Sequence, residues 1–517
     1  MRTVFYGHAC LKLDTAAGSV LMDPWFSREG AFYGSWFQYP ENAPLLEAAL
    51  AGTGAICVSH NHADHLDPAV LALACARDQA LRIHIPRYRT GWLVDRLARI
   101  AAPILDRFIE HEPWEPFEAG GASVFFVPEE APSAVDSAIV ASAGGESVVD
   151  LNDSHLSADQ LRRIRARLGR VDLLALQCSG ASEFPICYDY PLETRRALAR
   201  RKQADKLVHC REMIELLRPE RVLFFAGPPA FLDPRLAALD LPGDQSVFPD
   251  QLDVLRHFES SHPDIARRCY LAVPGDILSD EVLLARADPS QPRLDPYARK
   301  AEYLRAYAAR RADLPAFDWG TAPDDAASRR YFARMATLSR YISDSIAGPV
   351  TFVAREAGGR ELPYTVDFAT RRARPGRDDR ALYVLTFPAA CLHDLIEGRA
   401  TWDDVFLSLR TLFEERTDRF IVHLKTLLRY MDPALFAAVE QYERVLQGDT
   451  GDTFVLEAPG GRYRVQRRCP HAGTDLESQG RVDDDGGITC LAHRFCFDLD
   501  TGECRNVRGY RIKTERL

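Results

Sequence analysis

Two cysteine–histidine pairs near the C-terminus place the strongest constraint on the fold of this chain. Cys469 and His471 form the first pair in "CPHAG", and Cys490 and His493 form the second pair in "CLAHRFC". The spacings C-x-H and C-x-x-H indicate two tight turns, each of which presents one thiolate and one imidazole. Zinc sites also use two cysteines and two histidines, although such sites rarely begin with C-x-H. The pairs predict a small metal-binding domain at this end of the chain.

The same four residue types hold a [2Fe–2S] cluster of the Rieske type, in which two cysteines bind one iron and two histidines bind the other. After "LQGDTGDT" the chain consists of short strands and turns, such as "TFVLEAPGGRYRVQ" and "GITCLAHRFCFDLD", which suits a small all-β domain. This segment resembles Rieske domains. The resemblance implies a Rieske domain over residues 448–517, with Cys469, His471, Cys490 and His493 as cluster ligands.

A second metal motif lies near the other end of the chain. The run "VSHNHADHLDP" follows the apolar strand "AICV" and precedes a helix that we expect to start near Pro68. It contains His60, His62, Asp64 and His65 in the pattern H-x-H-x-D-H. A transition from strand to loop directs these side chains toward one point, and the two histidines and the Asp-His pair can hold two adjacent metal ions.

This motif resembles the metallo-β-lactamase superfamily. The resemblance implies an α/β fold, an αββα sandwich over residues 1–290, and a bridging carboxylate at Asp153 after "SVVDLN". Members of that superfamily usually carry a histidine after the strand that here begins "SVFFVPEEAPSAVDS", where this chain offers Glu129 or Glu130. His155 is a further substitute ligand. The predicted metal ligands are His60, His62, Asp64, His65, Glu129, Glu130, Asp153 and His155, and among them Asp64, Glu129, Glu130 and Asp153 are the catalytic candidates.

The replacement of histidine by carboxylate changes the chemistry that we expect. His60, His62 and a glutamate would form a two-histidine, one-carboxylate set, which is typical of non-heme iron that activates O2. Hydrolysis moves no electrons, whereas O2 activation needs them one at a time, and a Rieske cluster is a one-electron carrier. The two motifs together therefore favour a non-heme iron oxygenase, with a dinuclear iron centre bridged by Asp153.

The chain also resembles the CMP-N-acetylneuraminate hydroxylases. The segments that carry the resemblance occur in the expected order: "YGHACLKLD", "LMDPWF", "VSHNHADHLD", "SAIVASAGGESVVDLND", "LQCSGASEFP" and "FFAGPPAF". That family hydroxylates an N-acetyl methyl group of a nucleotide sugar with O2 and external electrons, and its Rieske domain comes first rather than last. The resemblance implies a monooxygenase that hydroxylates a C–H or N–H bond of a small polar substrate, but it does not identify the substrate.

Residues 291–447 contain helices and strands and predict an α+β middle region, loosely similar to sterol-carrier folds. Candidate substrate contacts precede it in "PLETRRALARRK", where Arg195, Arg196 and Arg200, with Arg201 and Lys202 beside them, could bind a phosphate or carboxylate. A solvated basic helix face is the alternative explanation. His8 and Asp23 follow two early strands, and we expect them to border the metal loop.

Composition limits the partners and the compartment. Lys and Arg total 64 against 74 Asp and Glu, which gives a net charge of −10 and argues against nucleic-acid binding. The first residues lack an apolar signal segment, and no apolar run is long enough to span a membrane, so we expect a cytoplasmic protein. There is no nicotinamide fingerprint, so the electrons must come from a separate reductase with a ferredoxin or a cytochrome b5-like protein.

Three questions stay open at this level. A metallo-β-lactamase-fold hydrolase with a redox-sensing Rieske domain is the main alternative, and it requires zinc or manganese in the N-terminal site. An electron-transfer protein with an inactive scaffold is the second alternative. Electron transfer also requires the two metal sites to lie close together. A head-to-tail homo-oligomer would satisfy this requirement if one chain cannot.

Overall fold

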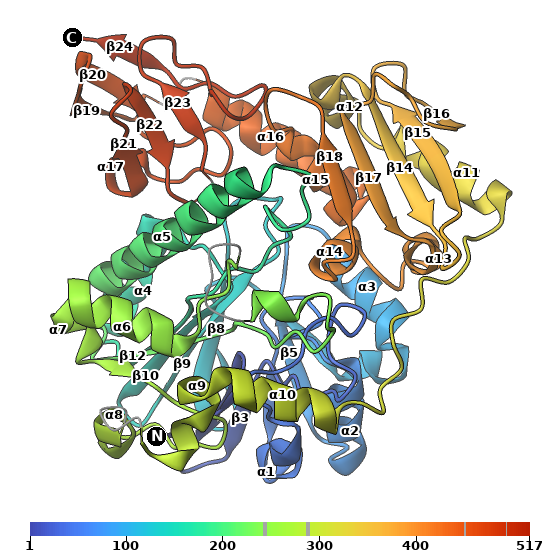
Figure 1. The fold of residues 1–517 in the computed structure, drawn as a ribbon. Coiled ribbons are helices and arrows are strands. Elements are labelled where there is room, and N and C mark those ends of the chain that lie inside the picture. Colours follow the sequence, from blue (N-terminus) through green and yellow to red (C-terminus); the bar gives the residue numbers. More distant parts are fainter. Residues whose placement is uncertain (241–245, 286–289, 449–450, 493) are drawn as a thin grey trace.

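The computed structural model describes residues 1–240, 246–285, 290–448, 451–492 and 494–517. An N-terminal region with two large sheets forms the lower part of the molecule in Figure 1, and a middle region and a C-terminal region lie above it. None of the helices in the described part of the chain combines the length and apolar character needed to cross a membrane.

Two sheets form the centre of the N-terminal region. The first has the strand order β1-β2-β3-β4-β5-β6, and its last four strands are parallel. The second has the order β13-β12-β11-β10-β9-β8-β7, and β10 to β13 are parallel. The strands of the first sheet are β1 (Arg2–Gly7), β2 (Cys10–Asp14), β3 (Ser19–Met22), β4 (Ala55–Cys57), β5 (Arg82–Pro86) and β6 (Phe108–His111). Those of the second are β7 (Phe117–Ala119), β8 (Ala122–Pro128), β9 (Ser137–Ala143), β10 (Glu146–Asn152), β11 (Leu173–Gln177), β12 (Arg221–Phe225) and β13 (Cys269–Tyr270).

The sheets pack face to face because each strand alternates its apolar side chains. In β3, Val20 and Met22 join a core shared with the second sheet, whereas Leu21 belongs to the cluster on the outer face. The outer face of the first sheet is covered by α1 (Leu46–Leu50), α2 (Pro68–Arg77) and α3 (Trp92–Ile100). That of the second is covered by α4 (Ala158–Leu168), α5 (Leu192–Leu217), α6 (Gln251–Ser261) and α10 (Lys300–Arg310). The result is the expected αββα sandwich.

The middle region contains one five-stranded sheet with the order β16-β15-β14-β17-β18. Its strands are β14 (Pro349–Arg355), β15 (Glu361–Asp367), β16 (Arg372–Pro375), β17 (Tyr383–Pro388) and β18 (Leu412–Glu415). Its helices are α11 (Asp325–Met335), α12 (Arg340–Ile346), α13 (Ala389–Glu397), α14 (Trp402–Leu407), α15 (Val422–Tyr430) and α16 (Pro433–Gln447). The hydrophobic core of this region also contains Trp25 and Trp36 from the N-terminal region, so the two regions share one core.

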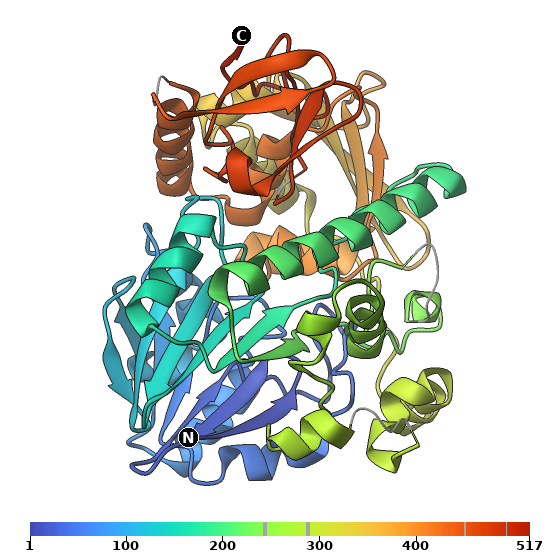
Figure 2. The same ribbon diagram turned by 90° about the vertical axis from the view of Figure 1, so that its left-hand side faces the viewer.

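The C-terminal region consists of two three-stranded sheets around a separate small core. Their strands are β19 (Thr453–Ala458), β20 (Gly461–Gln466), β21 (Gly480–Val482), β22 (Gly487–Cys490), β23 (Cys496–Asp498) and β24 (Thr514–Arg516). The remaining short helices are α7 (Pro263–Ala266), α8 (Asp280–Ala285), α9 (Asp295–Ala298) and α17 (Leu476–Gln479). The C-terminal region lies beside the long helix α5 in both views (Figures 1 and 2).

Candidate metal centre and its cavity

The H-x-H-x-D-H loop connects β4 to α2, as the sequence predicts. The loop is fixed at its far end by Asp67, whose carboxylate accepts hydrogen bonds from the backbone N–H of Val70, at 3.2 Å, and of Ser27, at 2.9 Å. The first of these caps α2, which begins at Pro68. The loop is therefore held in one conformation by groups that are not themselves metal ligands.

Asp23 orients the loop from the end of β3. Its carboxylate accepts hydrogen bonds from the backbone N–H of Ser59 at 2.7 Å and from the Ser59 hydroxyl at 2.6 Å, and it lies 2.8 Å from His65 Nδ1. A carboxylate on Nδ1 favours the tautomer that leaves Nε2 available to a metal. His8 and Asp23 have φ values of +49° and +43°, a left-handed backbone that non-glycine residues adopt mainly where the surrounding structure enforces it.

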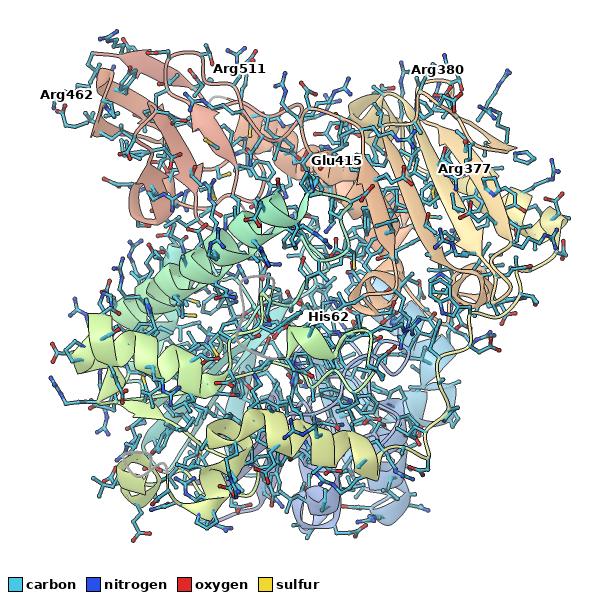
Figure 3. All side chains as sticks on the ribbon, in the orientation of Figure 1. His62, Arg377, Arg380, Glu415, Arg462 and Arg511 are labelled. Carbon is cyan, nitrogen blue, oxygen red and sulfur yellow. The ribbon has the colours of Figure 1, made fainter. Side chains whose placement is uncertain are left out.

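Six side chains converge in two groups, each of which has two histidines and one carboxylate. His8, Asp64 and His65 form the first group, and their ligand atoms lie within 4.8 Å of one another. His60, His62 and Asp153 form the second group, within the same limit. The groups adjoin each other, since His65 Nε2 lies 3.6 Å from Asp153 Oδ1. His62, which lies near the middle of the molecule, marks the site in Figure 3.

Several buried nitrogen and oxygen atoms that could bind a metal at this site lack hydrogen-bond partners in the described part of the chain. They are His8 Nδ1, Asp64 Oδ1, His65 Nε2, Asp136 Oδ1 and Asp153 Oδ1. Buried polar atoms without partners are costly, and cations bound at the two groups would give the carboxylate oxygens and His65 Nε2 such partners. Burial alone would raise the pKa of Asp153, but the nearby His65 imidazole outweighs it and holds this pKa below its usual value. Asp153 is therefore ionised, as a metal ligand must be.

Neither Glu129 nor Glu130 belongs to the two histidine–carboxylate groups that the described residues form. Both line a separate depression beside α4, and Glu129 Oε1 accepts a hydrogen bond from the backbone N–H of His155 at 2.5 Å. The carboxylate that lies beside the histidines is that of Asp136, whose Oδ1 is 3.5 Å from His60 Nε2. The connection after β8 turns Glu129 and Glu130 away, whereas Asp136 immediately precedes β9. That position at a strand end was the sequence signal that could have identified Asp136.

The middle region also reaches the metal site, which the sequence did not predict. Asp403 Oδ2 lies 3.8 Å from His62 Nε2 and accepts a hydrogen bond from Arg429 Nε at 2.6 Å. Burial would raise the pKa of Asp403, but Arg429 and then His62 lower it below its usual value. Asp403 is thus a charged neighbour that can orient the His62 ring from the side opposite His60.

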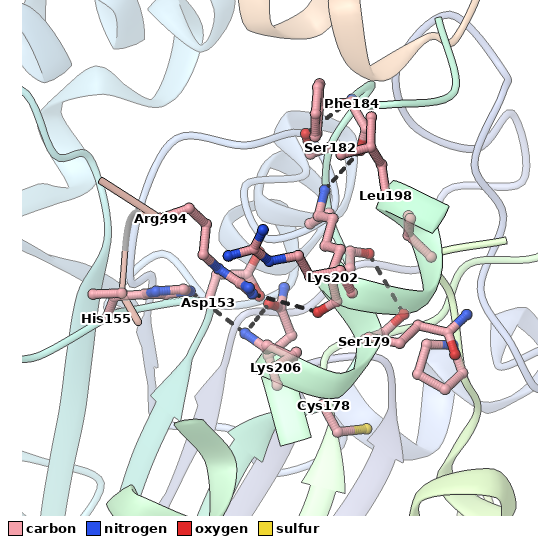
Figure 4. Close-up of a pocket in the computed structure, with 18 of the residues that line it drawn as sticks. Asp153, His155, Cys178, Ser179, Ser182, Phe184, Leu198, Lys202, Lys206 and Arg494 are labelled. Atoms are coloured by element: carbon pink, nitrogen blue, oxygen red, sulfur yellow. Dashed lines mark hydrogen bonds between the residues drawn. The ribbon is translucent and has the colours of Figure 1, made fainter. Parts of the chain in front are cut away.

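A cavity of about 980 Å³ opens from the metal site toward the C-terminal region. His62, Asp64, Asp136 and Asp153 line one part of it. Figure 4 shows Asp153, His155, Lys202 and Lys206 in this cavity, with Arg494 from the C-terminal region beside them. His155 belongs to neither histidine–carboxylate group, and its Nε2 lies 3.4 Å from Lys206 Nζ.

Of the five cations that the sequence offers on α5, Arg201 and Lys202 line this cavity, together with Lys206, which the sequence analysis did not single out. Arg195, Arg196 and Arg200 are not among the lining residues, and Arg196 Nη1 donates to Glu193 Oε1 at 2.7 Å. Among the α5 residues that line the cavity, Leu198, Lys202 and Lys206 recur every four positions and so share one face of the helix, with Arg201 and Gln203 on either side of Lys202.

Three of the four predicted cluster ligands, Cys469, His471 and Cys490, lie in two adjacent turns of the C-terminal region. Cys469 N–H donates to Thr474 O at 2.8 Å, and Cys490 N–H donates to Phe495 O at 2.9 Å. Burial raises the pKa of the Cys469 thiol well above its usual value, and the neighbouring Cys490 thiol contributes to this shift. Such thiols require a bound metal to ionise, which fits an iron–sulfur cluster. The ring of His471 stacks on Phe495, and His493 lies outside the described residues.

The second cluster turn contacts α5 of the same chain through a buried carboxylate. Asp205 is 2% exposed, and its Oδ1 accepts from Arg481 Nη1 at 3.0 Å. Arg494, four residues after Cys490, pairs with the same carboxylate, and Ala492 and Arg494 line the cavity that reaches the metal site. The turn that follows Cys490 and the N-terminal metal groups thus border one cavity within a single chain.

Two family models match the chain. Residues 438–514 match the Rieske [2Fe-2S] domain, and residues 19–224 match the beta-lactamase superfamily domain. The chain joins a metallo-β-lactamase fold to a Rieske domain. This agrees with the αββα sandwich and with the turns at Cys469 and Cys490, and the Rieske match supports a [2Fe–2S] cluster in the C-terminal region.

The chain is similar over its whole length to mycobacterial proteins. It is 28% identical to a provisionally named Rieske 2Fe-2S iron-sulfur protein of Mycolicibacterium smegmatis over 550 positions, which cover 100% of both chains. The identity to a protein of the same description from Mycobacterium tuberculosis is 27% over 541 positions, again with 100% of both chains covered. These relatives therefore align with the middle region as well as with both metal-binding regions.

Similarity to solved structures concerns the fold. The diiron beta-hydroxylase CmlA of Streptomyces venezuelae matches with 19% identity and a TM-score of 0.34, over 54% of this chain and 53% of that chain. The metallo-beta-lactamase fold protein YhfI of Bacillus subtilis matches with 13% identity and a TM-score of 0.33, over 54% of this chain and 98% of that chain.

Proposed function

We propose that this chain is an O2-dependent hydroxylase in which a Rieske cluster supplies electrons to a dinuclear non-heme iron centre. The observation that carries the proposal is the pair of adjoining groups, each with two histidines and one aspartate. Two histidines with one carboxylate form the typical ligand set of non-heme iron that activates O2, whereas the metal sites of zinc hydrolases contain a larger share of histidine ligands.

In this proposal, some residues of the chain would bind the two iron ions and others would orient these ligands. His8, Asp64 and His65 would hold one iron, His60, His62 and Asp153 the other, and Asp136 is close enough to join the second group. Iron bound in this way supplies O2 activation for insertion of oxygen into a C–H or N–H bond. Asp23 and Asp403 orient His65 and His62, respectively, from outside the ligand set.

The position of the C-terminal region supports electron delivery within one chain. The cavity at the metal site is bordered by Ala492 and Arg494, which follow Cys490 in the second cluster turn. We therefore expect electron transfer within one chain, without a head-to-tail oligomer. We expect an external ferredoxin or cytochrome b5-like protein, with its reductase, to reduce the cluster. The resemblance of the metal motifs to the CMP-N-acetylneuraminate hydroxylases favours hydroxylation of a small polar substrate in the cavity.

The test is the metal content of full-length protein purified without oxygen. We expect about four iron and two acid-labile sulfide per chain, with a non-Rieske iron signal in the Mössbauer spectrum that changes on exposure to O2. Two variants serve as matched controls. The double variant Cys469→Ser and Cys490→Ser should lose the sulfide and half of the iron, whereas His60→Ala and His62→Ala together should lose only the iron of the non-Rieske signal. Zinc in the N-terminal site together with hydrolytic activity in the absence of O2 would overturn the proposal.

A further inference from the structure

Helix α5 places two lysines in the cavity, one turn apart. Lys202 Nζ donates a hydrogen bond to the carbonyl oxygen of Phe184 at 2.9 Å, and Lys206 Nζ donates to Gln177 Oε1 at 2.7 Å. Figure 4 shows both lysines with Asp153 and Arg494 around the same space. In the part of the chain that the structure describes, neither ammonium has a carboxylate oxygen within 4.0 Å.

The arginines of the same cavity already have acidic partners. Arg481 and Arg494 pair with Asp205, and Arg429 pairs with Asp403. The remaining two, Arg201 and Arg505, pair with Asp205 and Asp498. Among the cationic side chains that line the cavity, Lys202 and Lys206 are therefore the two that form no salt bridge with a described side chain.

Burial makes this arrangement costly for the protein alone. The loss of solvent lowers the pKa of Lys202 to about 7, and the charged groups that face it are Glu183, Lys425, Arg494 and Lys206. Glu183 is the only acid among them, and it forms a salt bridge with Lys425 rather than with Lys202. A partly buried ammonium is stabilised when an anion supplies a charged partner, and hydrogen bonds to charged groups are the strong ones.

We propose that the cavity binds a small organic anion, a carboxylate or a phosphate monoester, whose anionic group contacts Lys202 and Lys206. The body of the molecule then occupies the space toward Asp153 and His62, which line the same cavity. A volume of about 980 Å³ accommodates a ligand of this kind. The inference deepens the proposed function, because it names the substrate class of the hydroxylase and rests on that assignment.

The test measures binding rather than turnover, with full-length, metal-containing protein under argon. The probes are phenylacetate, phenyl phosphate and the neutral amide phenylacetamide, and binding is followed by equilibrium dialysis. We expect at least one of the two anions to bind about tenfold or more tightly than the amide. The preferred anion distinguishes a carboxylate substrate from a phosphate monoester.

Three variants at Lys202 and Lys206, with a fourth at Lys513 as the control, locate the binding site. Lys202→Met and Lys206→Met should each weaken binding of the preferred anion about tenfold or more, while Lys202→Arg should retain most of it. Lys513→Met removes a charge from an exposed residue that does not line the cavity and should leave binding unchanged. Retention of the [2Fe–2S] absorption spectrum and of the circular dichroism spectrum would show that the variants fold.

Three results would overturn the inference: no binding of either anion at millimolar concentration, equal binding of the amide, or unchanged binding in both methionine variants. The last result would mean that the anion contacts the metal ions or another surface. The outcome is independent of the metal analysis. A zinc-containing protein that binds the anions through Lys202 would refute the hydroxylase assignment but support the anion site. An iron-containing protein that binds neither anion would support the hydroxylase assignment but refute the anion site.

Discussion

Asp205 should be one of the more important residues for the attachment of the Rieske domain to the rest of the chain. Its buried carboxylate contacts Arg481 and Arg494 from the C-terminal region and lies 3.7 Å from Arg201 of its own helix. The substitution Asp205→Asn keeps the shape of the side chain but removes its charge, and it leaves three guanidinium groups close together. Loss of one partner of a buried ion pair costs about 3–5 kcal/mol.

Solvent reduces this cost here. The side chains of Arg481 and Arg494 are 42% and 31% exposed, so we expect about 2–3 kcal/mol for Asp205→Asn. With a urea dependence of about 1–3 kcal/mol per molar, the unfolding midpoint of the C-terminal region should fall by roughly 1 M. The matched control is Asp159→Asn, which weakens the pair with Arg468 at the same boundary. Asp159 is 47% exposed, and we expect this change to cost less than about 1 kcal/mol.

Two optical probes separate the parts of the molecule in a urea titration. All six tryptophans precede residue 448, so their fluorescence reports on the N-terminal and middle regions. The visible absorption of the [2Fe–2S] cluster reports on the C-terminal region. We expect Asp205→Asn to lower the midpoint of the cluster signal more than that of the tryptophan signal, and to slow the oxidation of the reduced cluster by O2. If Asp205→Asn and Asp159→Asn cost the same, the buried carboxylate does not have the role argued here.

Three further predictions concern the metal site and the cavity. Asp136→Ala should weaken iron binding at the N-terminal site by about tenfold or more, measured by competition with a chelator, whereas Glu129→Gln should not; the opposite order would restore Glu129 as a ligand. Asp403→Asn should weaken iron binding about tenfold, because His62 loses a charged neighbour, and an unchanged chelator titration would contradict this. Because the pKa of Lys202 is about 7, the affinity for phenylacetate should be full below that pH and fall about tenfold per pH unit above it; constant affinity from roughly pH 6 to 9 would exclude Lys202 as the charged contact.

Short sequence patterns alone predicted most of the side chains that the structure brings together as candidate metal ligands. The H-x-H-x-D-H loop, Asp153 and the two cysteine–histidine turns all depend on residues within a few positions of one strand end or one turn, and such local geometry follows from the sequence itself. His8 and Asp23 were expected to border the loop for the same reason, since each follows a strand, and the structure brings both to it. The αββα sandwich likewise follows from alternating apolar strands between helices.

The tertiary structure decided which distant residues complete the site. Asp136 rather than Glu129 reaches His60, because the path of a connection between two strands is set by packing and not by the residue types within it. Asp403 is more than three hundred residues from His62 in the sequence, and only the core that the middle region shares with the N-terminal region brings them together. The face of α5 that points into the cavity was also decided by contacts with other regions. A sequence carries the chemistry of each group, but distances between remote groups arise only when the whole chain buries its apolar surface in one arrangement.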